Sequence, residues 1–538
     1  MPGDAPVLVA GAGPVGLTAA HELARRGVAV RLVDQAAGPA ESSRAIAVHA
    51  RTLEICAQMG LLDRLLPRGR RVEHFSIHRL GRLLIRFDTN YDDTPTAYPF
   101  SLMVDQVITE RVLRERLREL GVEVEWGVAL EGFTQHTGEV SVTLRHAGGR
   151  VEEAVVPWLL GTDGAHSTVR RQLGLRLRGE AIRTWLNADV VLDAPLPADS
   201  NHLLHTGDGT LLLVPFPEDG KWRVVDTAGR AVAEDPELVR NRLAAKLSRA
   251  LGRPVEVATP TWLSLFTVQQ RMIERMRVGR CFVAGDAAHV HSPASGQGMN
   301  AGMHDAYNLA WKLAAVVTGQ AEERLLDTYD EERLPVGATL LGSTRTATAL
   351  VALRNVLAPV LLPAGLGLLG LAKPVKRRVE RTMIRSFSGL ALSYADSSLS
   401  LPAAAGTGVP PGGRAAAVLA GTGAGPARAA LREELADPRW SLLCFGEGLG
   451  PVLDHVVRTH GHAVSVRAVP GPGPRSLPDP GGVLAAGFGL RGGGYALIRP
   501  DGYLAGKGPL TGAGQIEAVL AAVRLRAAAV PGGPDADH

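Results

Sequence analysis

The segment Val7-Leu8-Val9-Ala10-Gly11-Ala12-Gly13-Pro14-Val15-Gly16 decides the fold of the N-terminal part of this chain. Its first four residues are apolar and predict a buried strand, and its glycines predict a tight turn into a helix from Val15 to Arg26. Gly27 would end that helix, and Val28 to Val33 predicts a second strand, which is followed by Asp34. This order of elements is the first βαβ unit of a doubly wound parallel sheet.

The glycine turn also predicts a binding site for the pyrophosphate of a dinucleotide. Glycines in a G-x-G-x-x-G spacing let backbone amides and a helix N-terminus approach phosphate oxygens closely. Asp34 follows the second strand, where a carboxylate can accept hydrogen bonds from ribose hydroxyls. The expected contacts of this unit are Gly11, Gly13, Pro14, Val15, Gly16 and Asp34. By itself the unit does not distinguish FAD from NAD.

A second signature, Ala284-Gly285-Asp286-Ala287-Ala288-His289, indicates that the dinucleotide is FAD. The predicted strand from Arg280 to Ala284 ends in Gly285-Asp286, which can present a carboxylate to the ribityl chain of a flavin. The loop from 293 to 298 then leads into a helix, whose positive N-terminal end would stabilise negative charge on the reduced flavin ring. The expected contacts of this region are Gly285, Asp286, Pro293, Gly296, Gln297, Gly298, Met299 and Asn300.

Three further features occur in the order of a known family. The segment Gly161-Thr162-Asp163-Gly164-Ala165-His166-Ser167-Thr168-Val169-Arg170 is one, Arg44 in Ser42-Ser43-Arg44-Ala45 is another, and Gln106 heads a predicted helix. Together with the two signatures, they resemble the group A flavoprotein monooxygenases, typified by para-hydroxybenzoate and phenol hydroxylases, over roughly the first 400 residues. Within this family, the sequence most resembles the actinomycete aromatic polyketide hydroxylases.

This resemblance implies the roles of the residues in the three features. Asp163 and Gly164 would contact FAD and shape the approach of the nicotinamide, Arg44 would bind the flavin, and Gln106 would flank the ribityl chain. Arg44 and Pro293 are the residues expected to take part in catalysis, Arg44 by helping the flavin to move between exposed and buried positions.

The resemblance also implies an activity. NADPH, or NADH, would act as a transient reductant of FAD, and reduced FAD would react with O2 to give a C4a-hydroperoxide that hydroxylates a polycyclic aromatic substrate. The protein would supply orientation and a dry cavity, while the cofactor supplies the chemistry. The chain contains no second G-x-G-x-x-G after a strand, which agrees with a reductant that is held only transiently.

Two alternatives remain open from the sequence. The same scaffold could perform a Baeyer-Villiger insertion into a polyketide ketone, because the difference lies in the shape of the pocket and the protonation of the peroxide. The chain could also be a non-catalytic FAD-binding partner protein, although complete flavin motifs favour an enzyme. A flavin halogenase is not expected, since none of the seven tryptophans forms a Trp-x-Trp pair.

The expected fold class is α/β, with a Rossmann-like FAD-binding domain, an inserted substrate-binding β-sheet domain and a C-terminal thioredoxin-like domain. The last of these resembles the corresponding domain of phenol hydroxylase relatives in Ala496-Leu497-Ile498-Arg499-Pro500-Asp501-Gly502-Tyr503. It has no Cys-x-x-Cys pair, so a structural or interface role is expected. The first part of the FAD domain is expected at 1–175, with about 71–100 contributing to the substrate domain, and the substrate sheet at 176–274. The second part of the FAD domain and a helical segment are expected at 275–400. A linker would follow at 401–430, and the C-terminal domain at 431–538.

Composition narrows the class of partner. The chain has 538 residues, a formal net charge of +4 and three scattered cysteines, so nothing points to nucleic acid, a metal site or a disulfide framework, and a cytoplasmic enzyme is expected. The apolar stretch from Val356 to Ala372 is short and contains prolines and glycines, which favours helices docked on a neighbouring domain over a transmembrane span. The C-terminal domain would allow a homodimer.

Overall fold

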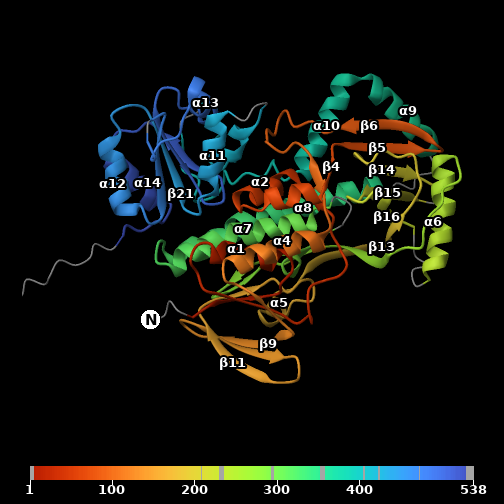
Figure 1. Cartoon of the computed structure of the whole chain (residues 1–538), viewed down its shortest axis with the longest axis horizontal. Helices are drawn as coiled ribbons and strands as arrows, with labels where there is room; N and C mark the ends of the chain where they lie inside the picture. The colour runs from red at the N-terminus through yellow and green to blue at the C-terminus, as the bar shows by residue number, and fades with distance from the viewer. Residues whose placement is uncertain are drawn as a thin grey trace, which may run out of the picture.

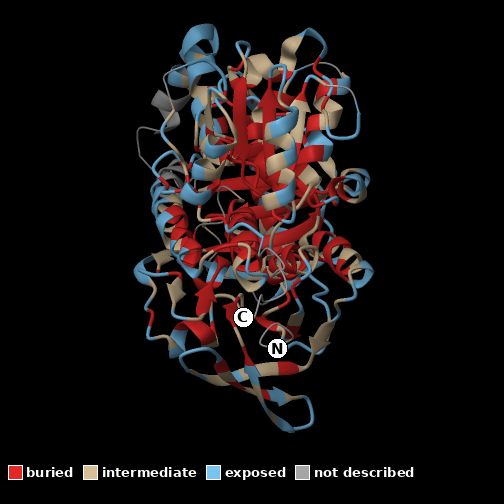
Figure 2. Ribbon diagram, turned by 90° about the vertical axis from the view of Figure 1, so that its left-hand side faces the viewer, coloured by how far each residue is buried: buried red, intermediate tan, exposed pale blue. Residues whose placement is uncertain are grey.

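The computed structural model describes residues 5–206, 209–228, 235–291, 296–351, 358–403, 406–421, 425–471 and 473–528. Figure 1 shows three regions: a C-terminal α/β unit on one side, a large sheet on the other, and a group of helices between them. In Figure 2 the buried segments concentrate in the middle of the molecule, and exposed segments form its margins. The expected α/β class is confirmed.

The FAD-side sheet has six strands in the order β18-β19-β12-β1-β2-β8. These strands are β1 (Val7–Ala10), β2 (Val30–Asp34), β8 (Val124–Trp126), β12 (Leu159–Gly161), β18 (Arg277–Val278) and β19 (Cys281–Val283). All neighbours pair in parallel except β18 and β19. Because parallel strands in the middle of such a sheet are buried on both faces, β1, β12 and β19 have no polar side chain, and Val7, Leu8 and Val9 are fully buried.

Helices cover this sheet and surround its neighbours. Helix α1 (Pro14–Ala24) packs against α4 (Gln106–Glu119) and α7 (Gly298–Val317). The other α-helices in the described part of residues 1–400 are α2 (Ala50–Gln58), α3 (Leu62–Leu65), α5 (Thr168–Gln172), α6 (Pro236–Leu251), α8 (Thr328–Val351), α9 (Ala358–Leu371) and α10 (Lys373–Phe387). Two small sheets accompany them, one of β9 (Val128–Gln135), β10 (Val140–His146) and β11 (Val151–Val156), the other of β3 (Ala47–Val48), β4 (Arg70–Val72) and β7 (Ser101–Met103).

The large sheet has eight strands in the order β20-β17-β13-β16-β15-β14-β5-β6. They are β5 (His74–Arg79), β6 (Arg82–Asp88), β13 (Arg178–Val191), β14 (Ser200–His205), β15 (Thr210–Pro215), β16 (Lys221–Asp226), β17 (Trp262–Met272) and β20 (His289–Val290). Strand β20 directly follows the Gly285-Asp286 turn and pairs with the end of β17. The sheet is therefore joined at its edge to the second flavin signature.

The two faces of the large sheet have different neighbours. The outer face packs on α6, where Val239, Leu243 and Leu247 are fully buried. The inner face carries Trp185 and Leu203, together with Val214, which also packs against the core of the β3-β7-β4 sheet. The inner face thus lies toward the segments that flank the flavin signatures.

The C-terminal unit is a four-stranded sheet in the order β22-β21-β23-β24 with helices around it. Its elements are α11 (Pro426–Ala436), β21 (Trp440–Phe445), α12 (Gly450–His460), β22 (Val464–Val469), α13 (Val483–Phe488), β23 (Gly494–Ile498), β24 (Leu504–Gly508) and α14 (Ala513–Ala522). Strands β21 and β22 are parallel, and the other pairs are antiparallel.

Two sequence predictions need correction. The expected linker at 401–430 is packed in its described part, since Ala415, Ala416 and Val418 belong to the core of the C-terminal unit. Alanines and glycines are typical of linkers, but here small side chains allow close packing.

The apolar stretch that includes α9 lies against β6, yet the Leu368 and Leu371 side chains are 69% and 83% exposed. The stretch is therefore not fully packed against the neighbouring sheet. Among the described residues, no helix is long and apolar enough to cross a bilayer.

Candidate flavin site

The two distant signatures meet in space at Val15. A Cβ atom added to Gly285 would lie 2.8 Å from Cγ2 of Val15, and one added to Gly302 on α7 would lie 2.6 Å from the same atom. Glycine at both positions lets α1, the Gly285-Asp286 turn and α7 pack together around one valine. The N-termini of α1 and α7 consequently lie close to the same turn.

The first glycine turn is shaped for close backbone contact. Gly11 has φ +105°, a conformation that L side chains rarely adopt. A Cβ atom on Gly16 would lie only 1.8 Å from the carbonyl oxygen of Gly11, so no side chain fits there. Around Gly13 nothing lies within 4 Å of an added Cβ, which leaves room for a ligand. Asp34 accepts a 2.7 Å hydrogen bond from the amide of Ala12, so its carboxylate holds the turn in addition to its proposed contact with ribose.

Asp163 lies against the same turn. One of its carboxylate oxygens, Oδ2, accepts hydrogen bonds from the amides of Thr168 at 2.7 Å and Val169 at 3.2 Å, so it caps helix α5. Its Oδ1 is buried and has no hydrogen-bond partner among the described residues. Because a buried acceptor is nearly always paired, this atom fits a donor group of a bound ligand. The glycine turn, the two helix N-termini and this acceptor together fit FAD.

The side chain of Arg44 is exposed, while its backbone carbonyl accepts a hydrogen bond. Beside it, the amide of Ala45 donates to Oε1 of Gln106 at 3.0 Å, and the Gln106 amide donates to the carbonyl of Ala45 at 3.1 Å. The structure therefore brings Arg44 and Gln106 together, as the expected site requires, and Gln106 holds the segment from which the Arg44 side chain projects.

Arg223 on β16 holds the same segment from the substrate side. Its guanidinium donates to both carboxylate oxygens of Asp189 at 2.7 and 2.8 Å, to the carbonyl of Arg44 at 2.6 Å and to the carbonyl of Ser43 at 2.7 Å. Arg223 and Asp189 are both buried. The sequence pattern did not single out either residue, because the partners lie 34 and about 180 positions apart.

The start of α7 forms the other end of the site. The side chain of Asn300 is used by the protein itself: Oδ1 accepts from the amide of His49 at 2.9 Å, and Nδ2 donates to the carbonyls of Ala47 and Gly296 at 2.8 Å each. Any contact of Asn300 with FAD would therefore come from its backbone amide, which belongs to the unpaired first turn of the helix. Met299 is buried, the Gln297 side chain donates to the carbonyl of Ser386, and Pro293 lies outside the described residues.

The buried carboxylate of Asp305 on α7 holds the backbone of the Gly285-Asp286 turn. Asp305 Oδ2 accepts from the Gly285 amide at 3.1 Å and pairs with Nε2 of His289 at 2.6 Å, while Oδ1 pairs with Arg333 at 2.7 Å. Burial works against ionisation of Asp305, but Arg333 and then His289 hold the pKa of its carboxyl well below the usual range. Gly285 has φ +64°, and the Asp286 side chain is exposed, free to contact a ligand.

The histidines next to the site have structural surroundings. His289 is occupied by Asp305, and its ring stacks on His291 with centroids 5.1 Å apart. Burial lowers the pKa of His291 to about 3. On the large sheet, His202 bonds to His78 at 3.0 Å and contacts Trp222, which belongs to the core on the α6 side. His202 therefore lies away from the inner face.

The inner face of the large sheet is mostly apolar, with a few buried polar atoms. Asn187 lies opposite Val225, and Leu203 opposite Leu212, so these side chains form one row across four strands. Neither the indole nitrogen of Trp185 nor Oδ1 of Asn187 has a hydrogen-bond partner in the part of the chain that the structure describes. Such a face suits a flat apolar molecule that carries a few hydrogen-bonding groups.

Comparison with known proteins identifies the family. The model of the "FAD binding domain" family matches residues 4–344. The chain is 59% identical over 526 residues to 6-methylpretetramide 4-monooxygenase of Streptomyces rimosus, covering 96% of this chain and 93% of that protein. Among solved structures, the anhydrotetracycline hydroxylase OxyS of Streptomyces rimosus is similar with a TM-score of 0.72 and 29% identity, over 96% of this chain and 98% of that one.

A third similarity concerns the fold alone. The flavin-dependent monooxygenase PieE, solved in complex with FAD and substrate, superposes with a TM-score of 0.79 at 23% identity, over 96% of this chain and 99% of that one. The expected resemblance and the expected cofactor, FAD, are confirmed by these findings. The chain belongs to the FAD-binding-domain family and is an FAD-dependent monooxygenase.

Proposed function

We propose that this enzyme hydroxylates a polycyclic aromatic polyketide of the pretetramide type, with NADPH as the reductant and O2 as the second substrate. The observation that carries the proposal is the 59% identity to 6-methylpretetramide 4-monooxygenase, which extends through the substrate sheet and the C-terminal unit. The inner face agrees with it, because a fused ring system needs a broad apolar wall and few polar contacts.

The protein's own contribution is orientation and exclusion of water. Bound FAD would supply the redox chemistry that activates oxygen. The first turns of α1 and α7 would hold its phosphates and the edge of its ring, Asp34 and Asp286 would bind its hydroxyl groups, and Asp163 would accept a hydrogen bond at its buried Oδ1. Arg44, whose side chain is exposed, would follow the flavin between its positions. Substrate would lie between this site and the inner face of the large sheet.

The test uses the purified enzyme reconstituted with FAD. NADPH oxidation is measured with and without 6-methylpretetramide, and the product is analysed by mass spectrometry after reaction under ¹⁸O₂. We expect substrate-stimulated NADPH oxidation and a product that gains one labelled oxygen. NMR of the product distinguishes ring hydroxylation from insertion into a carbon-carbon bond next to a ketone. NADPH oxidation that does not respond to 6-methylpretetramide or to any other polycyclic aromatic compound would overturn the proposed substrate class.

The proposal also includes an oligomeric state and a location. A homodimer is proposed for the native state and is tested by light scattering of the purified protein. A cytoplasmic location agrees with three cysteines that are all free and buried.

A further inference from the structure

The segment Arg499-Pro500-Asp501-Gly502 belongs to the C-terminal unit but projects into the flavin domain. It forms a tight turn in which the Gly502 amide donates to the carbonyl of Arg499 at 2.8 Å. Gly502 has φ +78°, and an added Cβ would lie 2.4 Å from Nε2 of Gln58 on α2. The backbone carbonyl of Asp501 accepts from Arg51 of α2 at 2.9 Å. The turn thus lies against α2 of the flavin domain, and the positive φ of Gly502 favours glycine at this position.

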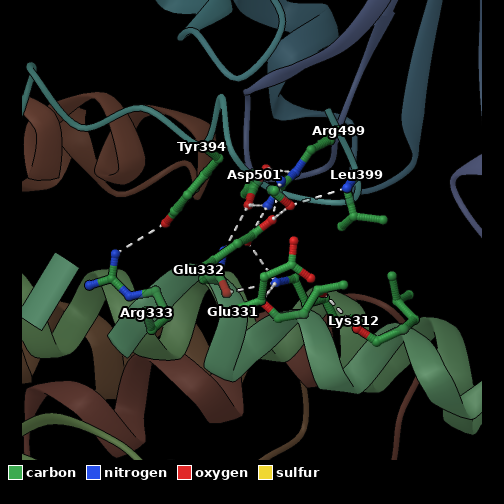
Figure 3. Close-up of polar contacts among 12 residues, drawn as sticks. Lys312, Glu331, Glu332, Arg333, Tyr394, Leu399, Arg499 and Asp501 are labelled. Carbon is green, nitrogen blue, oxygen red and sulfur yellow. Dashed lines mark hydrogen bonds and ion pairs between the residues drawn. The ribbon is translucent and has the colours of Figure 1, made fainter. Parts of the chain in front are cut away.

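Arg499 joins two buried carboxylates (Figure 3). It donates to both oxygens of Glu332 on α8 at 2.6 and 2.9 Å, and to both oxygens of Asp501 at 3.0 and 2.6 Å. Glu332 also accepts from Lys312 of α7 at 2.7 Å, and Asp501 accepts from the indole nitrogen of Trp311 at 3.1 Å. None of these groups is more than 3% exposed. The C-terminal turn is therefore joined to α8 by the Arg499–Glu332 ion pair and to α7 by the hydrogen bond from Trp311 to Asp501.

The next residue along α8 continues the network toward the flavin site. Arg333 follows Glu332 directly and donates to Asp305, whose other oxygen accepts from the Gly285 amide. Consecutive side chains on an α-helix point about 100° apart, so Glu332 and Arg333 face different neighbours on one rigid turn. A shift of that turn would move both contacts together.

A second connection runs through Tyr394. Its hydroxyl accepts from Arg333 at 3.1 Å, and its ring lies 4.9 Å from the guanidinium carbon of Arg499. Figure 3 shows Tyr394 between the C-terminal unit and Arg333. Both routes from Arg499 reach Arg333, and Arg333 reaches the backbone of the Gly285-Asp286 turn through one carboxylate.

The charges in this network balance. Arg333, Arg499 and Lys312 carry positive charge, and Asp305, Glu332 and Asp501 carry negative charge. Removing one member leaves an uncompensated charge in the interior, which the neighbouring groups can relieve only by moving or by changing protonation. Asp305 is the member whose movement directly affects the flavin site.

We infer that Arg499 and Asp501 are positioning residues for the flavin, and that the C-terminal unit sets the geometry of the Gly285-Asp286 turn through Glu332, Arg333 and Asp305. The unit thereby influences the affinity and the reduction potential of bound FAD without contacting it.

The test compares Arg499→Met with a matched control, Arg467→Met. Arg467 also lies in the C-terminal unit and pairs with a buried carboxylate, Glu434, at 2.7 Å, and among the described residues it has no hydrogen bond or ion pair with α7 or α8. The dissociation constant of FAD is measured by fluorescence quenching, and the midpoint potential of the bound flavin by dye equilibration. For Arg499→Met we expect the dissociation constant to rise about tenfold, within the range for coupling between sites, and the potential to shift. For Arg467→Met we expect both to stay at wild-type values.

A milder variant keeps the inference testable if Arg499→Met does not fold. Tyr394→Phe removes one hydroxyl, leaves every ion pair in place, and should weaken FAD binding by a smaller factor in the same direction. Arg499→Lys should restore part of the affinity, because one cation remains beside Glu332 and Asp501. Wild-type FAD affinity and potential in folded Arg499→Met, or in Tyr394→Phe if Arg499→Met is unfolded, would overturn the inference. An equal loss in Arg467→Met would also overturn it.

Discussion

Replacement of Arg223 by methionine should both destabilise the enzyme and weaken FAD binding. The change removes four hydrogen bonds of 2.6 to 2.8 Å and leaves Asp189 as a buried carboxylate without its cation. Breaking a buried ion pair from one side costs about 3–5 kcal/mol. At about 2–4 °C per kcal/mol for a unit of 150–250 residues, the unfolding midpoint should fall by roughly 6–20 °C. The carbonyls of Ser43 and Arg44 lose their donors at the same time, so the loop beside the flavin loosens.

The double variant Arg223→Met/Asp189→Asn separates the ion pair from the support of the loop. Removal of both charges leaves no unpaired ion, so the double variant should be more stable than the sum of the two single changes predicts, by about 1–3 kcal/mol. Its FAD affinity should stay low, because the carbonyls of Ser43 and Arg44 still lack donors. Calorimetry gives the midpoints, and fluorescence quenching gives the FAD dissociation constant.

The outer face of the same sheet provides the control. Lys246 on α6 pairs with Asp226 at the end of β16 at 2.7 Å, and both are buried on the α6 side of the sheet, away from the flavin segment. Lys246→Met should lower the midpoint by less than Arg223→Met, because Arg242 still pairs with Asp226 at 3.0 Å, and should leave the FAD dissociation constant unchanged. Strictly additive midpoints for Arg223 and Asp189, or wild-type FAD affinity in Arg223→Met, would refute the reasoning.

Three other outcomes follow from the site. Gly16→Ala should abolish FAD binding, because the new Cβ would lie 1.8 Å from the Gly11 carbonyl; a normal flavin spectrum after reconstitution would show that α1 can move aside. Arg44→Ala should change stability by less than about 0.5 kcal/mol, since the side chain is exposed, but should slow flavin reduction in stopped-flow experiments; an unchanged rate would exclude its proposed role. The folded-state pKa values of Asp305 and Glu332 lie below their unfolded values of about 4. The stabilisation that these ionised carboxylates provide is therefore present above about pH 5 and is lost as the pH falls. An unfolding midpoint that stays constant down to about pH 3 would contradict the ionised network.

The parts of the site that depend on backbone geometry could be read from the sequence. Gly11, Gly16 and Gly285 occupy positions where a side chain would clash or where φ is positive, and such requirements leave a glycine at a fixed spacing. The order of strand, turn and helix around them follows from local patterns of apolar residues. Strands β1, β2 and β19, and the glycine turns that follow β1 and β19, were therefore predictable from segments of ten residues or fewer.

The supporting ion pairs could not be predicted in the same way. Asp305 and Arg333 are 28 positions apart, Glu332 and Arg499 are 167 apart, and each would be taken for a solvated charge on a helix or loop. Only the packing of α7, α8 and the C-terminal unit removes water from them and makes their pairing necessary. The linker prediction for 401–430 was wrong for a related reason, because composition does not tell whether small residues are exposed or fill a core.

Exposed residues that face the flavin and buried residues that hold the backbone have separate roles, and this separation explains how the site can be both fixed and reactive. The residues expected to touch the flavin, Arg44 and Asp286, have exposed side chains on backbone segments that are held from behind. Arg223 holds the first segment from the substrate sheet, and Asp305 holds the second from α7. The exposed groups remain free to follow a moving cofactor, while the buried groups define where that movement starts. Substitutions of the buried residues should therefore change FAD affinity and stability together, whereas substitutions of the exposed ones should change the flavin's behaviour with little effect on folding.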